Sequence, residues 1–257
     1  MSIDTLAAFI EALDRAGELV RVREPVSLNL ELTEIADRAM KQRGGGKAIL
    51  VEQPTLMNGR RSEFPVGINL FGSMRRMSMA LGVGDLDEIG GRITALLQTK
   101  PPEGIVAKLA MLPRLLEIAK FPPRRKNGSA PCQEVVWRDA DVDLDRLPLM
   151  KCWPEDGGAY ITVPMVITRD PKRGIRNVGM YRIMQTGRNT LAMHWQRHKV
   201  GAAHWREMAE RGETMPVCIA IGADPPSMYS ASAPLPPTID EFLFAGFLRT
   251  APVMLTK

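Results

Sequence analysis

Residues 176–198 of the chain read RNVGMYRIMQTGRNTLAMHWQRH. Two apolar-rich runs flank the turn-forming residues TGRN, and this pattern predicts a β-hairpin. All three histidines of the chain lie between positions 194 and 204. The stretch therefore predicts a binding site as well as a hairpin. The side chains in it that can hold a metal ion, a phosphate or a carboxylate are Asn177, Tyr181, Arg182, His194 and His198.

Asn177 and Arg182 lie on the first strand of this hairpin with opposite parity. In an ideal strand they would point to opposite faces. Both can serve one site only if the strand is bulged or twisted between them, and Gly179 is the residue best suited to such a distortion. We therefore expect an irregularity near Gly179. On residue type alone, Asn177 is equally a hydrogen-bonding residue at a strand edge, and Arg182 is more often an exterior salt-bridge residue.

Glu241, in the segment TIDEFLFAG, is the carboxylate that best complements these groups. An Asn oxygen, a His nitrogen and a Glu oxygen suit a borderline-hard divalent ion such as Mn²⁺. A helix is expected from Thr238 to Arg249, with Thr238 as N-cap and Glu241 in a capping box. A capping box would use the carboxylate at its own helix terminus, so the two interpretations of Glu241 compete.

Composition indicates a soluble globular protein. The chain has 257 residues, 45% hydrophobic and 25% charged, with a net charge of +5. The basic cluster KFPPRRK at 120–126 has no aromatic stacking residues or nucleic-acid motif beside it, which favours a solvated linker and no nucleic-acid partner. Three cysteines without CxxC spacing exclude a disulfide framework and fit a reducing compartment. Without a signal peptide or a long apolar run, we expect a cytoplasmic protein.

Residues 1–120 predict a small N-terminal α+β domain without a credible catalytic group. The first helix is expected to start at an Asp4 N-cap and to close at Gly17. The glycine run 44–46 lacks the phosphate-loop pattern and precedes a strand, so a tight turn is expected there. Predicted helices cover 4–16, 30–42, a short SMRRMSMAL helix after Ser73, 86–98 and 104–120. Predicted strands cover 18–24, 47–53 and 64–70, the last two central.

Residues 121–132 are proline-rich and aperiodic, which predicts a linker, and residues 133–257 change to short strands separated by turns. Such strands indicate a β-barrel or a strongly curved sheet, so the fold class is α+β. The loop at 229–233 offers backbone oxygens to a monovalent cation. Glu155 and Asp156 are interpreted as a solvated turn or a feature beside the active site, and His204 as a core or surface residue. The predicted elements are strands QEVVW, YITVPMVITR, IRNVGMYRIMQT, NTLAMHWQ and MPVCIAIG, and helices at 202–211 and 238–249.

Eight segments follow one another in a single order that resembles the UbiD family of prenylated-FMN-dependent decarboxylases. They are TEIADRAM, INLFGS, SAPCQEVV, LPLMKCWPEDGG, RNVGMYR, MHWQRHK, IGADPP and PLPPTIDEFLFAGFLR. The resemblance covers nearly the whole chain. Family members are about twice this long, and their acidic motif of the Glu-Gly-Pro-x-Gly-Asp/Glu type is absent here. The chain thus resembles the N-terminal half of such an enzyme, with an α/β domain and an incomplete split β-barrel flavin-binding domain at 133–257.

The resemblance implies the site residues. Asn177, His198 and Glu241 would hold a divalent metal that bridges to the cofactor phosphate, with Mn²⁺ as the main ion and K⁺ as a second candidate. His198 matches the family's metal-side histidine better than His194 does, and the choice stays open. Arg182 would be catalytic and pair with a glutamate from the second half. The implied contacts of prenylated FMN are Met180, Tyr181, Arg182, His194, Trp195, Gln196, Lys199 and Val200.

The implied reaction is reversible, non-oxidative decarboxylation of an aromatic or α,β-unsaturated acid. The nearest resemblance is to the ubiquinone-pathway branch acting on 4-hydroxy-3-polyprenylbenzoate. A flavin prenyltransferase would supply the cofactor, the enzyme would be a homo-oligomer, and a polyprenylated substrate would bring it to a membrane surface. The alternative is a non-catalytic flavin- or phosphate-binding module, or a subunit that needs a second chain for activity.

Overall fold

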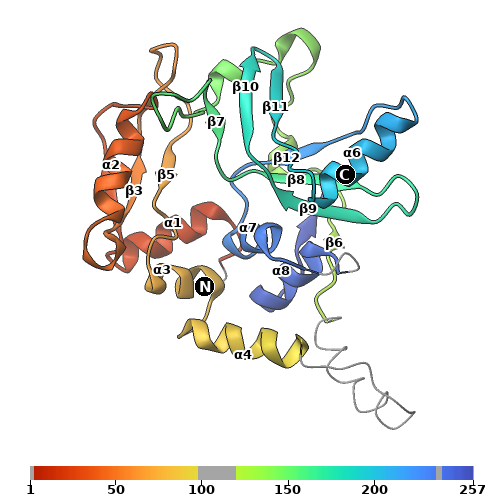
Figure 1. The fold of residues 1–257 in the computed structure, drawn as a ribbon. Helices are drawn as coiled ribbons and strands as arrows, with labels where there is room; N and C mark the ends of the chain where they lie inside the picture. Colours follow the sequence, from red (N-terminus) through yellow and green to blue (C-terminus); the bar gives the residue numbers. More distant parts are fainter. Residues whose placement is uncertain (1–2, 98–119, 236–238, 257) are drawn as a thin grey trace.

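A computed structural model describes residues 3–97, 120–235 and 239–256 (Figure 1). The α+β class is confirmed, because helices and several small sheets alternate along the chain. The helix expected at 104–120 lies outside the described residues except at its last position. None of the described helices is both long enough and apolar enough to span a membrane.

The first part of the chain is built on a three-stranded sheet of order β1-β3-β5. Strand β3 is central as predicted, whereas β5 lies at the edge, so its predicted central position is wrong. The alternating faces of β3 are both covered: Ile49 and Val51 pack with Leu32 of α2, and Leu50 packs with Phe9 of α1. The elements are α1 (Leu6–Arg15), β1 (Leu19–Val22), β2 (Val26–Ser27), α2 (Glu31–Met40), β3 (Ala48–Val51), β4 (Pro54–Thr55), β5 (Val66–Ile68), α3 (Met74–Leu81) and α4 (Leu86–Leu97).

Local caps define the helices of this part. Ser73 caps α3 as predicted, with its hydroxyl accepting the Arg76 N–H at 3.2 Å. Thr5 caps α1, so the Asp4 cap is wrong; the hydroxyl of Thr5 accepts the Ala8 N–H at 3.0 Å. Gly17 closes that helix with a left-handed φ of 69°.

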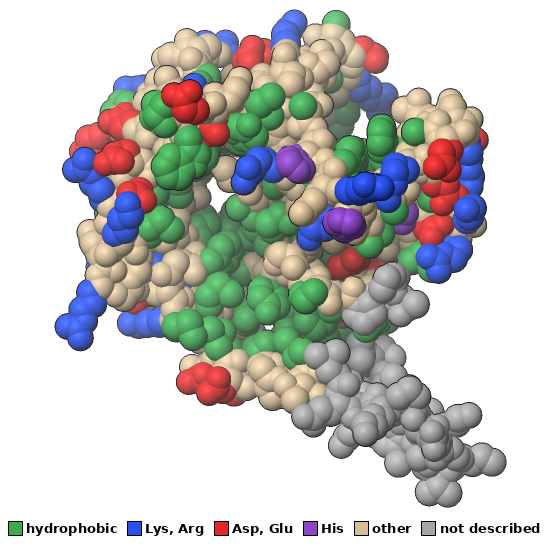
Figure 2. Space-filling model, viewed as in Figure 1, with side chains coloured by type: hydrophobic (Ala, Val, Ile, Leu, Met, Phe, Trp, Pro, Cys, Tyr) green, Lys and Arg blue, Asp and Glu red, His purple; other side chains and the backbone are tan. Residues whose placement is uncertain are grey.

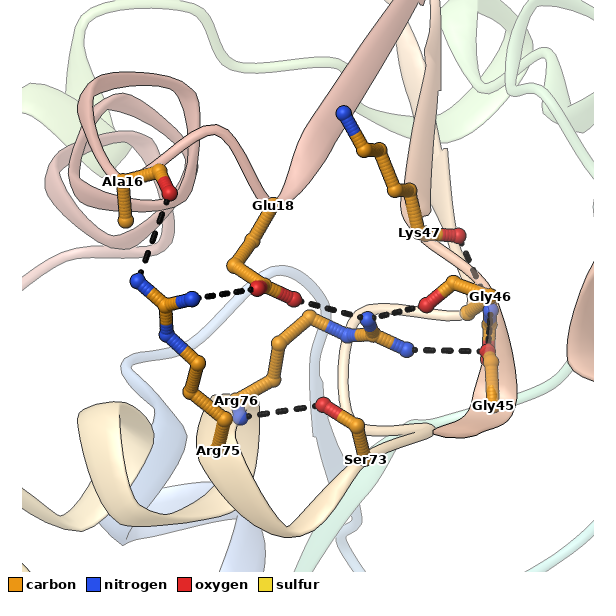
Figure 3. A network of polar contacts seen from close by, with 9 residues as sticks. Ala16, Glu18, Gly45, Gly46, Lys47, Ser73, Arg75 and Arg76 are labelled. Atoms are coloured by element: carbon orange, nitrogen blue, oxygen red, sulfur yellow. Dashed lines mark hydrogen bonds and ion pairs between the residues drawn. The ribbon is translucent and has the colours of Figure 1, made fainter. Parts of the chain in front are cut away.

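The glycine run forms the expected tight turn, and its carbonyls face a buried arginine (Figure 3). Arg76 is fully buried and donates to the Gly46 and Gly45 carbonyls at 2.6 and 3.2 Å. Its Nη1 also contacts Glu18 at 3.2 Å. A side chain at Gly45 would place Cβ 1.8 Å from the Gly72 oxygen, at a φ of +84°. Because two of its carbonyls accept hydrogen bonds from Arg76, this turn is joined to the core of the first part.

The second part contains two three-stranded sheets, of orders β11-β10-β7 and β12-β8-β9. These two sheets occupy the region for which a split β-barrel was expected. A short parallel pair, β6 with β13, joins the predicted linker to the end of the chain. The boundary at 121–132 itself stays a prediction. The elements are β6 (Arg124–Arg125), β7 (Tyr160–Ile161), β8 (Met165–Arg169), β9 (Arg176–Met180), β10 (Ile183–Gly187), β11 (Thr190–Met193), α6 (Val200–Glu210), β12 (Cys218–Ala220), α7 (Pro225–Ser232), α8 (Glu241–Arg249) and β13 (Met254–Leu255).

The predicted hairpin is confirmed for β10 and β11, which pair antiparallel around a two-residue turn at 188–189. An irregularity between Asn177 and Arg182 is confirmed, but it is not a bulge at Gly179, which pairs in regular register with Val166. The chain instead leaves one sheet after Met180 and enters the other at Ile183. This break between sheets, not a bulge, frees Arg182 from the parity of β9.

Three further expectations fail. Residues 133–137 are not a strand: a 3₁₀ turn ends at Gln133, and Val135 is 73% exposed. The loop at 229–233 is largely the end of α7, whose Tyr229 carbonyl accepts the Ala233 N–H at 3.1 Å. That removes the basis for a monovalent-cation loop. The third is the capping box predicted for Glu241, because Asp240 is the N-cap of α8 and Glu241 is its first residue.

Helices α7 and α8 join the two parts of the molecule (Figure 1). Phe242 and Ala245 of α8 pack with Met165 and Val178 of the β8–β9 pair. The opposite side of α8 contributes to another cluster, formed by Leu81, Ile89, Phe244, Phe247 and Leu248. Since α8 is buried on both sides, its N-terminus is held rigidly against β9.

Candidate active site

The start of α8 differs from the predicted capping box. Asp240 is the N-cap, and its Oδ1 accepts the N–H groups of Phe242 and Leu243 at 2.8 and 3.1 Å. Glu241 is therefore the first helical residue, and its carboxylate is not needed for the cap. Its Oε2 accepts the backbone N–H of Val178, on β9, at 3.0 Å. Burial raises the pKa of Glu241, and the nearby Arg176 charge opposes that rise.

Asn177 lies beside this carboxylate, because the N–H that Glu241 accepts belongs to the peptide bond that follows Asn177. The Asn177 side chain is buried, and its Nδ2 makes no well-formed hydrogen bond, although it lies near enough to the Tyr181 hydroxyl to interact with it. The two ends of an amide are exchanged by a flip, which would present Oδ1 at the position of Nδ2. Oxygen atoms from an amide and a carboxylate are ligands that suit Mn²⁺. The residues present therefore fit a divalent cation.

Arg176 fastens the start of α8 to β9. Its Nη2 pairs with Asp240 at 2.5 Å, and its guanidinium lies 4.8 Å from the ring centroid of Phe242. These contacts orient α8 so that Glu241, the residue after the cap, faces the edge of β9. A carboxylate at a helix N-terminus also gains from the positive end of the helix dipole.

Tyr181 ties β9 to the segment that carries the predicted histidine. Its hydroxyl accepts the Gly201 N–H at 2.9 Å, and its ring meets Trp195 edge to face at 5.0 Å. A Cβ at Gly179 would lie 2.5 Å from the Tyr181 ring, and one at Gly201 would lie 2.7 Å from its hydroxyl. Both glycines are required for this close packing. Burial raises the pKa of Tyr181.

The other predicted contacts lie between β11 and α6. His194, Gln196, His198, Lys199 and Val200 are exposed there, with His198 in the turn that precedes α6. In the part of the chain that the structure describes, no interaction links His198 to Asn177 or Glu241, and no group of three or more His, Cys, Asp and Glu side chains is arranged to hold a metal. Figure 2 shows histidines beside Lys and Arg side chains on this face.

Arg182 and Tyr181 line a cavity of about 360 Å³ next to this site, together with Met180. The cavity is also lined by residues that the sequence analysis did not single out as site residues: Cys152, Trp153 and Tyr160. The predicted turn residue Asp156 lines it as well. Burial raises the pKa of Cys152; the Asp156 charge adds to this rise and the Arg182 charge opposes it. The segment CWPEDGG was the available signal, because loops rich in Pro and Gly often border sites.

His204 is a core residue, in line with its prediction. It is buried on α6, and its Nδ1 lies 3.0 Å from the Thr168 hydroxyl. Burial lowers its pKa. A satisfied, neutral imidazole has no role at the site formed by Asn177 and Glu241.

Comparison with known proteins covers both parts of the chain. Residues 10–93 match the 3-octaprenyl-4-hydroxybenzoate carboxy-lyase N-terminal domain, and residues 124–257 match its Rift-related domain. A protein of Aquifex aeolicus is 45% identical over 97% of this chain and 50% of its own length. One of Archaeoglobus fulgidus is 45% identical over 100% of this chain and 51% of its own length. The chain thus spans about half the length of the curated relatives it matches.

Solved structures with the same fold include UbiD-class enzymes. The vanillic acid decarboxylase of Sedimentibacter hydroxybenzoicus, in closed form, has a TM-score of 0.80 at 26% identity, over 99% of this chain and 50% of that one. The UbiD-class enzyme HmfF of Pelotomaculum thermopropionicum, in complex with FMN, has a TM-score of 0.79 at 25% identity, over 98% of this chain and 50% of that one. An evolved dimeric HmfF in complex with prFMN shares the fold, with a TM-score of 0.80 at 24% identity, over 99% of this chain and 52% of that one. The domain matches and the fold together show that this chain belongs to the UbiD family, of which it represents the N-terminal half.

Proposed function

We propose that this chain is the cofactor-binding half of a UbiD-type carboxy-lyase that reversibly decarboxylates an aromatic or α,β-unsaturated acid. One observation carries the proposal: Asp240 caps α8 in place of Glu241, and the Glu241 carboxylate is held at the Val178 N–H, beside the buried Asn177 amide, whose Nδ2 makes no well-formed hydrogen bond. A buried carboxylate next to such an amide is costly in an empty protein, and a cation offsets that cost. Family membership supports the reaction class.

Asn177, His198 and Glu241 are the residues we assign to a divalent ion, with Mn²⁺ as the expected metal. Glu241 would bind in its ionised form, because a bound cation outweighs the burial that disfavours its charge. His198 is exposed in the turn that precedes α6, and its place in this set rests on the family resemblance. K⁺ is not part of the proposal, because the residues expected to bind it belong mostly to α7.

Prenylated FMN, when bound, would supply the electron sink for loss of carbon dioxide. We assign its contacts to Met180, Tyr181, Arg182, His194, Trp195, Gln196, Lys199 and Val200. Arg182 would bind the substrate carboxylate, because its planar guanidinium can donate two parallel hydrogen bonds. Met180 and the buried Tyr181 would line the cavity beside the reacting acid, with the exposed Trp153 at its rim.

The candidate substrate is 4-hydroxy-3-polyprenylbenzoate, as in ubiquinone biosynthesis. A flavin prenyltransferase would supply the cofactor, and the enzyme would be a cytoplasmic homo-oligomer that meets a membrane surface through its substrate. A second candidate function is a non-catalytic flavin- or phosphate-binding module that depends on another chain. This alternative rests on the share of its relatives that the chain spans, about half of their length.

Co-expression with a flavin prenyltransferase, followed by visible absorption and metal analysis, tests the proposal. Bound flavin and about one Mn²⁺ per chain are expected, with both lost in Asn177→Ala and Glu241→Ala. Asn189→Ala and Glu210→Ala, at exposed positions on the hairpin turn and α6, serve as matched controls. A protein joined to its second half that still purified colourless and metal-free would refute the decarboxylase proposal.

A further inference from the structure

The cavity at Arg182 carries two opposite charges. Among the described residues that line it, Arg182 is the one cation and Asp156 is the one anion. The other lining residues are apolar, hydroxyl-bearing or, at Cys152, a thiol. The proposed function uses Arg182 and gives no task to Asp156, although both face the same space of about 360 Å³.

The two charges do not neutralise each other. In the part of the chain that the structure describes, no ion pair or hydrogen bond joins the Arg182 guanidinium to the Asp156 carboxylate. Both charges nevertheless act on the Cys152 thiol. Its pKa is raised chiefly by burial, raised further by the Asp156 charge and lowered by the Arg182 charge. A ligand in this cavity would therefore meet a positive group and a separate negative group.

The Asp156 carboxylate is held in place by the backbone of its own loop. Its Oδ2 accepts the N–H groups of Cys152 and Trp153 at 3.2 and 2.9 Å, and its Oδ1 takes no part in these bonds. The loop is itself tied to α2, because the Cys152 carbonyl accepts the Thr33 hydroxyl at 3.2 Å. The negative charge is thus fixed at the lining of the cavity, with Oδ1 free to accept a further hydrogen bond.

A fixed carboxylate in a binding cavity discriminates between ligands by their charge. An acid with one carboxylate gains by placing it at Arg182, away from Asp156. A second carboxylate on the same ligand would meet Asp156 without a cation to compensate it, and such a like-charge contact is a means of rejecting the wrong partner. A hydroxyl or amino group in that position would instead donate to a charged acceptor.

We infer that Asp156 is a specificity-determining residue of the Arg182 cavity, which selects monocarboxylic acids and rejects acids that carry a second carboxylate. The inference rests on the proposed function for the position of the first carboxylate, at Arg182. It adds a selection by charge, together with a fixed orientation of the acid between the two charged side chains.

Calorimetric titration of this chain with three acids tests the inference without any cofactor. The probes are benzoate, 4-hydroxybenzoate and terephthalate, which share a ring and one carboxylate and differ in the group at carbon 4. The parent chain should bind 4-hydroxybenzoate at least about tenfold more tightly than terephthalate. Asp156→Asn keeps an oxygen that can accept the two backbone N–H groups but removes the charge. It should bring the two affinities to within about threefold.

Glu155→Gln is the matched control, because it removes the same charge one residue away. Glu155 is exposed and is not among the residues that line the cavity. The preference for 4-hydroxybenzoate should survive in this variant. Benzoate, which has no group at carbon 4, should bind all three proteins with affinities within about threefold of one another, because it needs only Arg182 and the shape of the cavity.

Equal affinity of the parent chain for 4-hydroxybenzoate and terephthalate would overturn the inference, and so would a preference that persists in Asp156→Asn. Loss of benzoate binding in Asp156→Asn would show that Asp156 acts by holding its loop and not by its charge, which would equally overturn it. A parent chain that binds none of the three acids would do the same.

These outcomes are independent of flavin and metal content, which test the proposed function. A colourless, metal-free enzyme with an Asp156-dependent preference would refute the decarboxylase proposal and leave Asp156 as a determinant of acid binding. A flavin- and metal-loaded enzyme without that preference would support the proposed function and overturn the role of Asp156.

Discussion

The Glu241 carboxylate and the Val178 backbone N–H are joined by a hydrogen bond of 3.0 Å that connects the first residue of α8 to the free edge of β9. Asp240 makes this possible by capping the helix in place of Glu241. The bond satisfies one edge N–H and holds a buried carboxylate next to Asn177. The candidate metal site thus depends on two adjacent acidic residues with different tasks.

Glu241→Gln should change how stability depends on pH in the metal-free protein. Burial raises the pKa of Glu241 in the folded state, so the folded protein binds more protons than the unfolded chain just above the unfolded pKa. Stability therefore falls as pH rises through that window, and glutamine removes this component. In urea titrations at pH 4 and pH 7, the variant should gain stability relative to the parent at pH 7. An unchanged difference at the two pH values would contradict the buried, ionisable Glu241.

Arg76→Ala should destabilise the protein by about 3–5 kcal/mol, because it leaves Glu18 and two glycine carbonyls without their buried partner. Arg75→Ala is the natural control: Arg75 contacts the same Glu18 at 3.1 Å, but its side chain is 65% exposed (Figure 3). That change should cost less than about 1 kcal/mol. Urea denaturation of both variants measures the contrast, and equal losses would show that burial does not set the strength of this network.

Gly179→Ala should disturb the site from within a regular strand. The new alanine Cβ would lie 2.5 Å from the Tyr181 ring, so the ring must move. That movement weakens the hydrogen bond that the Tyr181 hydroxyl accepts from the Gly201 N–H. A loss of about 1–3 kcal/mol in unfolding free energy is expected, with weaker flavin retention. Gly91→Ala, on α4 with nothing within 4 Å of the new methyl, should be neutral or stabilising. Thermal unfolding with visible absorption separates the two, and a Gly179 variant that behaved like Gly91 would refute the packing role of Tyr181.

Arg182→Lys should reduce kcat by about 100-fold in the full-length, cofactor-loaded enzyme, because an ammonium group cannot reproduce a bidentate contact with a carboxylate. Arg188→Lys, in the exposed turn of the hairpin, should leave turnover unchanged. Steady-state carbon dioxide release measures both. If the two variants were equally active, Arg182 would not face the reacting acid.

Much of the site could be recognised from local sequence. The hairpin at 183–193 forms because strand-forming residues flank a short turn, and neither feature needs the rest of the molecule. Family membership likewise followed from ordered segments along the chain. The irregularity predicted near Gly179 takes the form of a passage between two sheets after Met180 and not of a bulge, because parity arguments assume one continuous strand.

Cys152 and Trp153 were not identified as site residues, and Asp156 was placed either in a solvated turn or beside the active site, because loop residues carry no periodicity that reveals what they face. The position of this loop depends on contacts with α2, more than a hundred residues earlier in the chain, including the bond from Thr33 to the Cys152 carbonyl. Such long-range contacts form only when the two parts of the chain pack together.

The sequence by itself determined the local elements, the α+β class and the identity of the chemically useful side chains, because caps, turns and periodicity act over a few residues. Only the tertiary structure decided what those side chains are free to do. Asp240 caps α8, whereas the sequence pattern had favoured Thr238. Arg176, on β9, holds Asp240 in place through an ion pair. Glu241 is thereby turned to the edge of β9, because a buried helix end must satisfy the groups it meets across space as well as those beside it in sequence.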